Sequence, residues 1–335
     1  MSFSNEAFLV KDYVPIQVAS YVPADIHDVR QLATWLASPK SRENPTVRHW
    51  IGFLNTHYVI FQRIAALYPT INTESDRTGK KDNISVATTA EEMLYIANGL
   101  YHLKQQGVTG YVLECGCFKG YSSCCLSHAC RSLGYTLIMA DSFEGLPSNT
   151  RETGSDTYYQ PGDFAGSISE VANYVKAYGA EEAVEVLKGW YSETLSNWSK
   201  PLALLWIDVD LVSSVHDILG PCLPYLKDNG MLFSNEFDER MVHPDGRLIE
   251  ENEYCRSFLD HLDQLHRPYH AAHLTNWTAL MTFGDGPGGK SYLTLRELLK
   301  LNLYTPSAAK PYNRTNEFIK TIVAKGKASI KKIVG

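Results

Sequence analysis

The sequence lacks three features that would each assign it to a particular class of protein. No run of about 18 apolar residues occurs, so no transmembrane helix is expected. Basic residues are not in excess: the net charge is −6 and the pI is near 6.0, which argues against nucleic acid as a partner. Residues 1–6 contain no basic region followed by an apolar run, so no signal peptide is expected.

Cysteine motifs for metal binding are also missing. The seven cysteines are odd in number, and Cys115-x-Cys117 has neither zinc-ribbon spacing nor a second pair. We therefore expect no zinc site, but small buried core residues of a reduced, cytoplasmic protein. Five of the cysteines lie close together in the sequence: Cys115, Cys117, Cys124, Cys125 and Cys130.

The sequence does contain enough apolar residues for a sizeable core, with 44% hydrophobic and 11% aromatic residues among 335. Helical and strand patterns alternate from about residue 85, which predicts an α/β fold with a doubly wound, seven-stranded, mostly parallel sheet. The last two strands, joined by a tight turn, should be antiparallel to each other. The strands are expected at residues 110–115, 136–141, 184–188, 202–208, 231–234, 269–274 and 278–283.

The chain divides into three expected segments. Residues 1–84 form an N-terminal helical cap or arm, with helices at 25–37 and 46–67 and an exposed polar loop at 69–83. Residues 85–290 form the α/β domain, whose first helix begins with capping boxes at Thr88 and Thr89. Residues 291–335 form a helical tail.

A glycine turn at residues 116–120 is the most informative stretch. A short strand ending at Glu114 and Cys115 leads into a turn with Gly116 and Gly120, and a helix follows. Glycines let the backbone approach a ligand closely, and Asp141, at the end of the next strand, suits a ribose diol. These features predict a nucleotide-like cofactor. The G-x-G-x-x-G fingerprint of nicotinamide cofactors is not met, and a plain strand–turn–helix without a ligand remains an alternative.

Acidic and amide side chains follow four of the predicted strands. Because right-handed crossovers put all strand–helix loops on one edge of the sheet, these side chains should converge. Oxygen donors of this kind suit Mg²⁺ or Ca²⁺, although Asp208 and Asp210 can instead cap the next helix. His243, in the loop after the fifth strand, either reaches a substrate or is simply solvated. The converging set is Glu114, Asp141, Asp208, Asp210, Asn235 and Glu236.

Several motifs in order resemble a known family. Residues 114–123 and the run from Asp141 to Pro147 are similar to class I S-adenosylmethionine-dependent methyltransferases, which have a Rossmann-like sheet. More narrowly, the chain resembles the macrocin O-methyltransferase (TylF/MycF/NovP-like) family over about residues 85–285. The further matching pieces are residues 162–164, 188–195, 207–211 and 276–278.

The resemblance implies a set of site residues. S-adenosylmethionine would be bound with Asp141 on the ribose and with Gly189 and Trp190 at the adenine, while Asp208, Asp210 and His243 are the candidate catalytic residues. The family's Mg²⁺ ligands map to Asp208, Asn235 and Glu236, where Asn-Glu replaces the family's Asp-Asp pair. The implied cofactor-binding set is Glu114, Gly116, Phe118, Gly120, Ser122, Asp141, Ser142, Phe143, Asp163, Gly189, Trp190 and Asp208.

The function that follows is S-adenosylmethionine-dependent O-methylation of a hydroxyl on a sugar-containing or other hydroxylated small molecule, as in natural product biosynthesis. The alternatives are a nucleotide-sugar or dinucleotide oxidoreductase and a non-catalytic, methyltransferase-like binding module. Family resemblance also implies a homo-oligomer formed through the N-terminal helices. The basic end of the tail, residues 318–334, either contacts an anionic membrane or packs as a surface helix.

Overall fold

The computed structural model describes residues 22–27, 29–72, 88–147, 161–237, 239–243, 246–275 and 277–283. The predicted C-terminal tail, most of the polar loop at 69–83 and the middle of the loop at 142–166 lie outside these residues. Within the described ranges, no helix combines the length and the apolar character that crossing a membrane requires.

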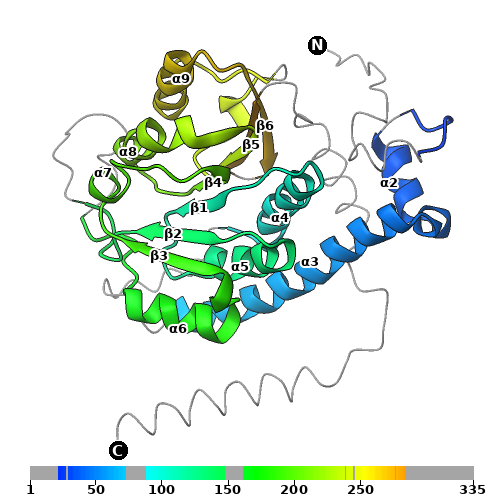
Figure 1. Cartoon of the computed structure of the whole chain (residues 1–335), viewed down its shortest axis with the longest axis horizontal. Helices are drawn as coiled ribbons and strands as arrows, with labels where there is room; N and C mark the ends of the chain where they lie inside the picture. The colour runs from blue at the N-terminus through cyan, green and yellow to red at the C-terminus, as the bar shows by residue number, and fades with distance from the viewer. Residues whose placement is uncertain are drawn as a thin grey trace, which may run out of the picture.

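The sheet has seven strands in the order β3-β2-β1-β4-β5-β7-β6, which confirms the expected doubly wound fold. Strands β1 to β5 are parallel, and β7 pairs antiparallel with both β5 and β6 (Figure 1). The strands are β1 (Tyr111–Cys115), β2 (Leu137–Asp141), β3 (Val184–Lys188), β4 (Leu202–Ile207), β5 (Leu226–Ser234), β6 (Tyr269–Thr275) and β7 (Thr278–Phe283).

Helices cover both faces of the sheet because the strand residues alternate between two apolar clusters. Leu204 and Trp206 belong to the cluster under α3–α6, whereas Leu205 and Ile207 belong to the one under α7–α9. The helices are α3 (Pro45–Asn72), α4 (Ala90–Gln105), α5 (Tyr121–Leu133), α6 (Ile168–Tyr178), α7 (Tyr191–Thr194), α8 (Val212–Cys222) and α9 (Glu253–Leu265). All seven cysteines are buried with free thiols, as expected of core residues.

Two predicted boundaries differ from the structure by five residues, and the helix expected from residue 25 begins at Val29. The helix expected to end at Leu67 continues through Pro69 to Asn72, although a proline inside a helix removes one backbone hydrogen bond and its ring crowds the preceding turn. The fifth strand begins at Leu226 rather than Met231. Leu226 pairs with Leu202 before the register shifts, so residues 227–230 form an irregular part of β5.

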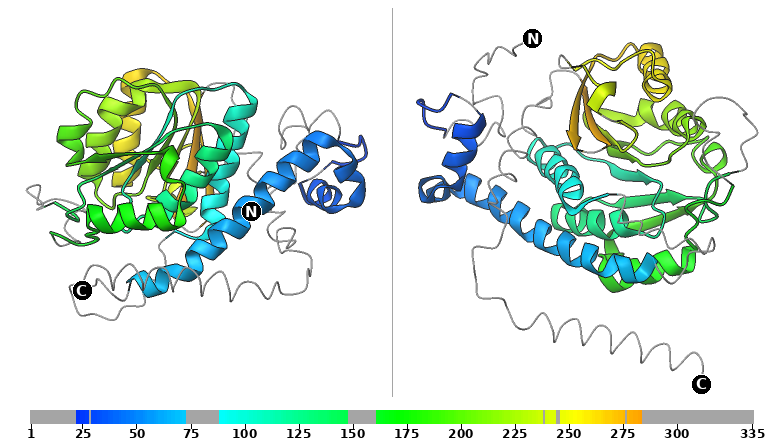
Figure 2. Two further views of the ribbon diagram at one scale, coloured as in Figure 1. Left: turned by 60° about the horizontal axis from the view of Figure 1, so that its bottom comes forward. Right: turned by 180° about the vertical axis from the view of Figure 1, so that it is seen from behind.

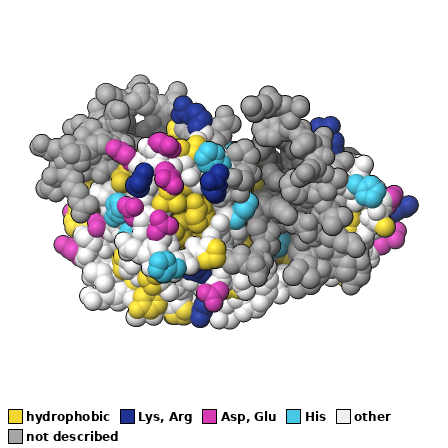
Figure 3. Space-filling view, turned by 90° about the horizontal axis from the view of Figure 1, so that it is seen from above, with side chains coloured by type: hydrophobic (Ala, Val, Ile, Leu, Met, Phe, Trp, Pro, Cys, Tyr) yellow, Lys and Arg dark blue, Asp and Glu magenta, His cyan; other side chains and the backbone are white. Residues whose placement is uncertain are grey.

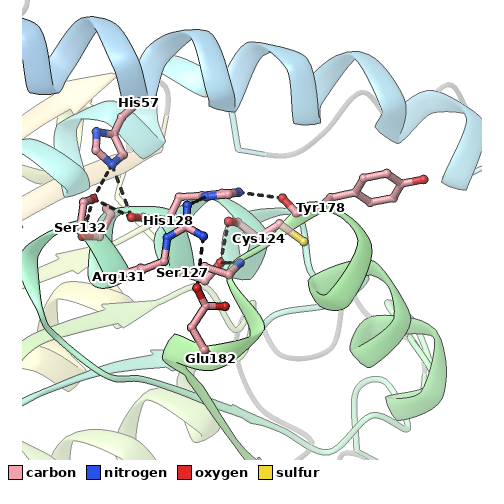
Figure 4. A network of polar contacts seen from close by, with 10 residues as sticks. His57, Cys124, Ser127, His128, Arg131, Ser132, Tyr178 and Glu182 are labelled. Carbon is pink, nitrogen blue, oxygen red and sulfur yellow. Dashed lines mark hydrogen bonds and ion pairs between the residues drawn. The ribbon is translucent and has the colours of Figure 1, made fainter. Parts of the chain in front are cut away.

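The long helix α3 lies along α4 and α5, and α2 (Val29–Ala37) projects at its N-terminal end (Figure 2). A polar network fixes α3 to the domain (Figure 4). Buried His57 of α3 lies 2.8 Å from the Ser132 hydroxyl of α5, and His128 of α5 lies 2.8 Å from the carbonyl of Tyr178 in α6. The helical arm and the α/β domain therefore share one core in the described residues.

Candidate active site

The strand register brings four chain segments to the same level at the carboxyl ends of the sheet. Cys115 pairs with Ala140 and Ile207, and Ile207 pairs with Ser234. The residues that follow these strands therefore lie in a row. The ladder of backbone hydrogen bonds extends across that row: Gly116 N to Ala140 O (3.1 Å), Asp208 N to Cys115 O (3.0 Å) and Asn235 N to Ile207 O (2.9 Å).

This rim has two sides, which we name by their residues. The turn side consists of Glu114–Gly120 and Asp141, and the acid side consists of Asp208–Asp210, Asn235 and Glu236. The two sides meet at Gly116, whose φ is +86°. A Cβ atom on Gly116 would lie only 1.8 Å from the carbonyl oxygen of Asp208, so only glycine fits there.

Asp141 holds the glycine turn in place. Its Oδ2 accepts hydrogen bonds from the backbone amides of Cys117 (2.9 Å) and Phe118 (3.3 Å), and its Oδ1 accepts one from the amide of Phe143 (2.7 Å). Phe118 and Phe143 both have positive φ, of 44° and 58°. These bonds hold backbone conformations that non-glycine residues rarely adopt. Asp141 as a whole residue is half-buried beside the turn.

Glu114 supports the turn from below. Its side chain is fully buried, and its two oxygens accept hydrogen bonds from the hydroxyls of Ser122 (2.5 Å) and Ser123 (2.6 Å) in the first turn of α5. Burial raises the pKa of Glu114 to about 7, partly opposed by these two bonds. These surroundings suit a supporting role for Glu114 beneath the turn.

The loop before α6 packs onto the turn. Leu146 N donates to Asp163 O (2.8 Å), and the Phe118 and Phe164 rings meet edge to face with centroids 5.9 Å apart. A Cβ on Gly166 would lie 2.1 Å from the Phe118 carbonyl oxygen. This loop therefore fits closely against the turn, and Phe164 remains 38% exposed at its tip.

The remaining predicted cofactor residues lie around Asp141. Ser142 and Phe143 are buried directly after it, and the Ser142 hydroxyl donates to Gly145 O (2.9 Å). Gly189 N donates to Asp141 O (2.9 Å), so the end of β3 adjoins the end of β2. Half-buried Trp190 begins the short helix α7. Gly189, Trp190 and the segment after Asp141 therefore lie next to the turn side.

Asp208 is the central acid of the acid side. Its half-buried carboxylate accepts a hydrogen bond from Thr88 Oγ1 to Oδ2 and another from Asn235 Nδ2 to Oδ1, both 3.3 Å long. Burial and the neighbouring charge of Asp210 raise the pKa of Asp208 to about 7, and the two donors partly oppose this shift.

Glu236 and Asp210 complete the acid side. Glu236 is buried, and its Oε1 accepts hydrogen bonds from the backbone amides of Val209 (2.8 Å) and Asp210 (3.1 Å). Burial, followed by the charges of Asp210 and Asp208, raises the pKa of Glu236 to about 8. Asp210 has a φ of 62° and lies directly before Leu211, the N-cap residue of α8.

His243 lies apart from this network. Its side chain is exposed, and its backbone pairs with Arg247 in the loop after β5. The described hydrogen bonds of Asp208 come from Thr88 and Asn235 instead. The face seen in Figure 3 mixes histidine, acidic and basic side chains around an apolar centre.

Sequence reasoning missed Glu92 and Thr278 as members of the site. Glu92 forms the expected capping box with Thr89, and its other oxygen lies 3.1 Å from the Thr278 hydroxyl, which also lies 3.1 Å from Asn235 Oδ1. The capping-box pattern of Thr89 and Glu92 indicated only that a helix starts there, and not that Glu92 contacts Thr278. Thr278 stood within a matching motif without an assigned role.

The oxygen donors of the acid side, as arranged, do not fit a divalent cation. Such a cation needs oxygen atoms that converge on it. Asn235 instead turns its Nδ2 toward Asp208, and Glu236 directs Oε1 to backbone amides. Among the described residues, no group of three or more His, Cys, Asp or Glu side chains is placed to hold a metal ion.

Comparisons with known proteins find a similarity in the central part of the chain. Residues 113–237 match the family model "Methyltransferase domain". The O-methyltransferase NovP superimposes with a TM-score of 0.54 at 17% identity, over 68% of this chain and 98% of NovP, which shows a common fold. The sheet and its flanking helices are thus the Rossmann-like fold of class I methyltransferases.

Two further structures are similar at lower TM-scores. The calicheamicin methyltransferase CalS11 gives 0.43 at 17% identity, over 79% of this chain and all (100%) of CalS11. The methyltransferase PaMTH1 of Podospora anserina, bound to SAH, gives 0.39 at 15% identity, over 68% of this chain and 88% of PaMTH1. No curated protein sequence matches the chain.

Proposed function

We propose that this chain is an S-adenosylmethionine-dependent O-methyltransferase that acts on a hydroxyl of a sugar-containing or other hydroxylated small molecule. The observation that carries the proposal is the meeting, at Gly116, of a glycine turn with Asp208, an acid whose pKa lies near 7. The methyltransferase-domain match and the likeness to an O-methyltransferase support the reaction class. The acceptor class rests on the motifs shared with the macrocin O-methyltransferase family.

The turn side suits the cofactor. A carboxylate offers about four acceptor sites, two on each oxygen. Asp141 Oδ2 accepts from the Cys117 and Phe118 amides and from the Cys117 thiol, whereas among the described residues Oδ1 accepts from the Phe143 amide alone, and the residue is half-buried. It therefore retains capacity for a ribose hydroxyl. Gly189 and Trp190 border the same place. Bound S-adenosylmethionine would supply a methyl group already activated by its sulfonium.

The acid side suits the acceptor. An alcohol is a weak nucleophile near neutral pH, so a base that takes up its proton assists transfer, and such a base works best with a pKa near the working pH. Asp208 meets this requirement and adjoins the turn side, whereas exposed His243 lies outside the hydrogen-bond network of Asp208. We therefore assign Asp208 as the base. The proposal includes no cation, because the donors do not fit one.

Titration calorimetry with S-adenosylmethionine, S-adenosylhomocysteine and NAD tests this proposal. We expect the first two to bind and NAD not to bind. Absence of binding by both sulfur compounds would end the proposal, and binding of NAD alone would favour the oxidoreductase. A methyl-transfer screen with a labelled donor, against glycans and small hydroxylated metabolites, would then identify the acceptor.

A further inference from the structure

Asn235 connects the acid side, through Thr278, to the first turn of helix α4. Its Nδ2 donates to Asp208 Oδ1 at 3.3 Å, and its Oδ1 accepts from the Thr278 hydroxyl at 3.1 Å. Thr278 begins β7 and is fully buried. The two ends of the Asn235 amide therefore have different partners, and these partners define which end faces Asp208.

Glu92 fixes the position of Thr278. Glu92 is fully buried in the first turn of α4, where its Oε2 accepts from the backbone amide (2.6 Å) and the hydroxyl (3.0 Å) of Thr89. Its Oε1 lies 3.1 Å from the Thr278 hydroxyl. The capping box thus anchors a continuous line of contacts from α4 through Thr278 and Asn235 to Asp208.

The line of contacts leaves both oxygens of Asp208 with hydrogen-bond donors. Asn235 donates to Oδ1, and Thr88, which precedes α4, donates to Oδ2. Amide hydrogens carry partial positive charge and repel a cation. A cation beside Asp208 would require the opposite orientation of Asn235, with Oδ1 toward Asp208, but that orientation would give up the Thr278 bond to Oδ1.

We propose that the Asn235 amide occupies the place beside Asp208 that a divalent cation would need, and that Thr278, when its single hydroxyl hydrogen is donated to Asn235 Oδ1, is the positioning residue that sets the amide's orientation. The acid side is then a site without a cation, in which neutral donors hold the Asp208 carboxylate. The inference depends on the proposed function only for Asp208 as the base. Its statement about cations is independent of that function.

Binding of Mn²⁺, followed by electron paramagnetic resonance of the free ion, tests the inference without any acceptor. We expect the wild-type chain to leave the free Mn²⁺ signal unchanged at millimolar concentration. Asn235→Asp, which replaces the amide by a carboxylate of the same shape, should bind one Mn²⁺ at least about tenfold more tightly. The double variant Asn235→Asp/Asp208→Asn should lose that binding.

Stoichiometric Mn²⁺ binding by the wild type that disappears in Asp208→Asn would overturn the inference, and so would a folded Asn235→Asp chain that binds no ion. If Asn235→Asp does not fold, the comparison of wild type with Asp208→Asn still decides. Calorimetry with S-adenosylmethionine on the same samples reports separately on the proposed function. A negative result there would leave the Mn²⁺ result valid.

The role of Thr278 has its own matched pair of variants. Thr278→Val removes the hydroxyl that donates a hydrogen bond to Asn235 Oδ1. The Asn235 amide can then rotate so that Oδ1 faces Asp208, and weak Mn²⁺ binding should appear. Thr278→Ser keeps the hydroxyl and should exclude Mn²⁺ as the wild type does. Equal exclusion by both variants would show that Thr278 does not set the orientation of Asn235.

Discussion

Glu114 and Asp208 end neighbouring strands, and burial raises the pKa of each to about 7. Their surroundings nevertheless differ. Glu114 is fully buried under two serine hydroxyls of α5, whereas Asp208 is half-buried and is held by Thr88 and Asn235, which come from distant parts of the chain. The same shift therefore accompanies a fully buried residue on the turn side and a half-buried one on the acid side.

The backbone shows the same contrast between support and reaction. Four of the five non-glycine residues with positive φ in the described part of the chain, Phe118, Phe143, Phe164 and Asp210, lie at this rim. Three of them surround the turn, where Asp141 and close packing hold them. The shape of the turn side is thus made mainly by the backbone, whereas in the proposed function the acid side is a set of side chains that exchange a proton.

Removing the half-buried acid should have the largest effect. Asp208→Asn keeps the shape of the side chain but cannot accept a proton, so turnover should fall by about 10²- to 10⁴-fold. Affinity for S-adenosylmethionine should stay within about twofold, because the turn side is unchanged. Methyl-transfer rates and calorimetry check the two parts. Unchanged turnover would show that the acid side does not carry the reaction.

The pH dependence of wild-type turnover tests the same assignment of Asp208 as the base. A base with a pKa of about 7 is protonated below that pH, so kcat/KM should rise through about pH 7 and then level off. If kcat/KM does not rise between about pH 6 and pH 8, the protonation of Asp208 does not control the rate.

The junction between the two sides should be the next most sensitive place. Gly116→Ala would put a Cβ 1.8 Å from the Asp208 carbonyl oxygen, so we expect a loss of roughly 3 kcal/mol or more in the free energy of unfolding. Gly162→Ala is the control, since Gly162 has a similar φ of 84° with no atom within 4 Å of the added Cβ. It should cost about 1 kcal/mol. Urea denaturation measures both, and equal losses would contradict the close contact.

Glu114 provides the test of a fully buried acid. Its folded-state pKa of about 7 lies above the ordinary 4.5, so the folded protein holds the proton more tightly than the unfolded chain does. The stability from this group is present below about pH 4.5, falls as pH rises, and is lost above about pH 7. Glu114→Gln cannot ionise.

The unfolding free energy of Glu114→Gln should therefore improve relative to wild type by up to roughly 3 kcal/mol between pH 4.5 and 7. Urea denaturation at a series of pH values checks this. A difference that stays constant with pH would show that Glu114 has the same proton affinity in both states.

Much of this arrangement follows from the sequence. Apolar runs such as Leu202–Ile207 predict buried strands, and parallel order places Asp141, Asp208 and Asn235 on one edge. The partners of each oxygen do not follow, because they depend on contacts between residues far apart in sequence. Thr278 and Glu92 are 186 positions apart, and nothing in their local patterns indicates that they meet.

The same limit applies to individual roles on the rim. Asp141 is recognisable as an acid at a strand end, but its bonds to the Cys117 and Phe118 amides appear only once the turn is folded. Asn235 is visible as a departure from an aspartate pair, whereas the end of its amide that faces Asp208 is set by Thr278. Local patterns thus locate the site, and tertiary contacts assign its oxygens.

The smallest expected effect concerns His57, a buried titratable group away from the rim. We propose no functional role for His57, so it serves as a structural comparison for Glu114 and Asp208. Burial lowers the pKa of His57 below 6.5. Just below pH 6.5, His57 is therefore protonated more often in the unfolded chain than in the folded protein. Wild-type stability should therefore fall as pH decreases below about 6.5, whereas His57→Leu should lose less over the same range.

At pH 7.5, His57→Leu should cost about 1 kcal/mol, for the lost contacts to Phe53 O and Ser132. Glu182→Gln, at the exposed end of the same network (Figure 4), is the control and should leave the urea midpoint unchanged, because its ion pair with Arg131 lies in solvent. Acid sensitivity that persists in His57→Leu would assign the proton uptake to another group. A shifted pKa at His57 without any effect on methyl transfer would show that burial alone does not mark a functional residue, and that Asp208 stands out by being only half-buried.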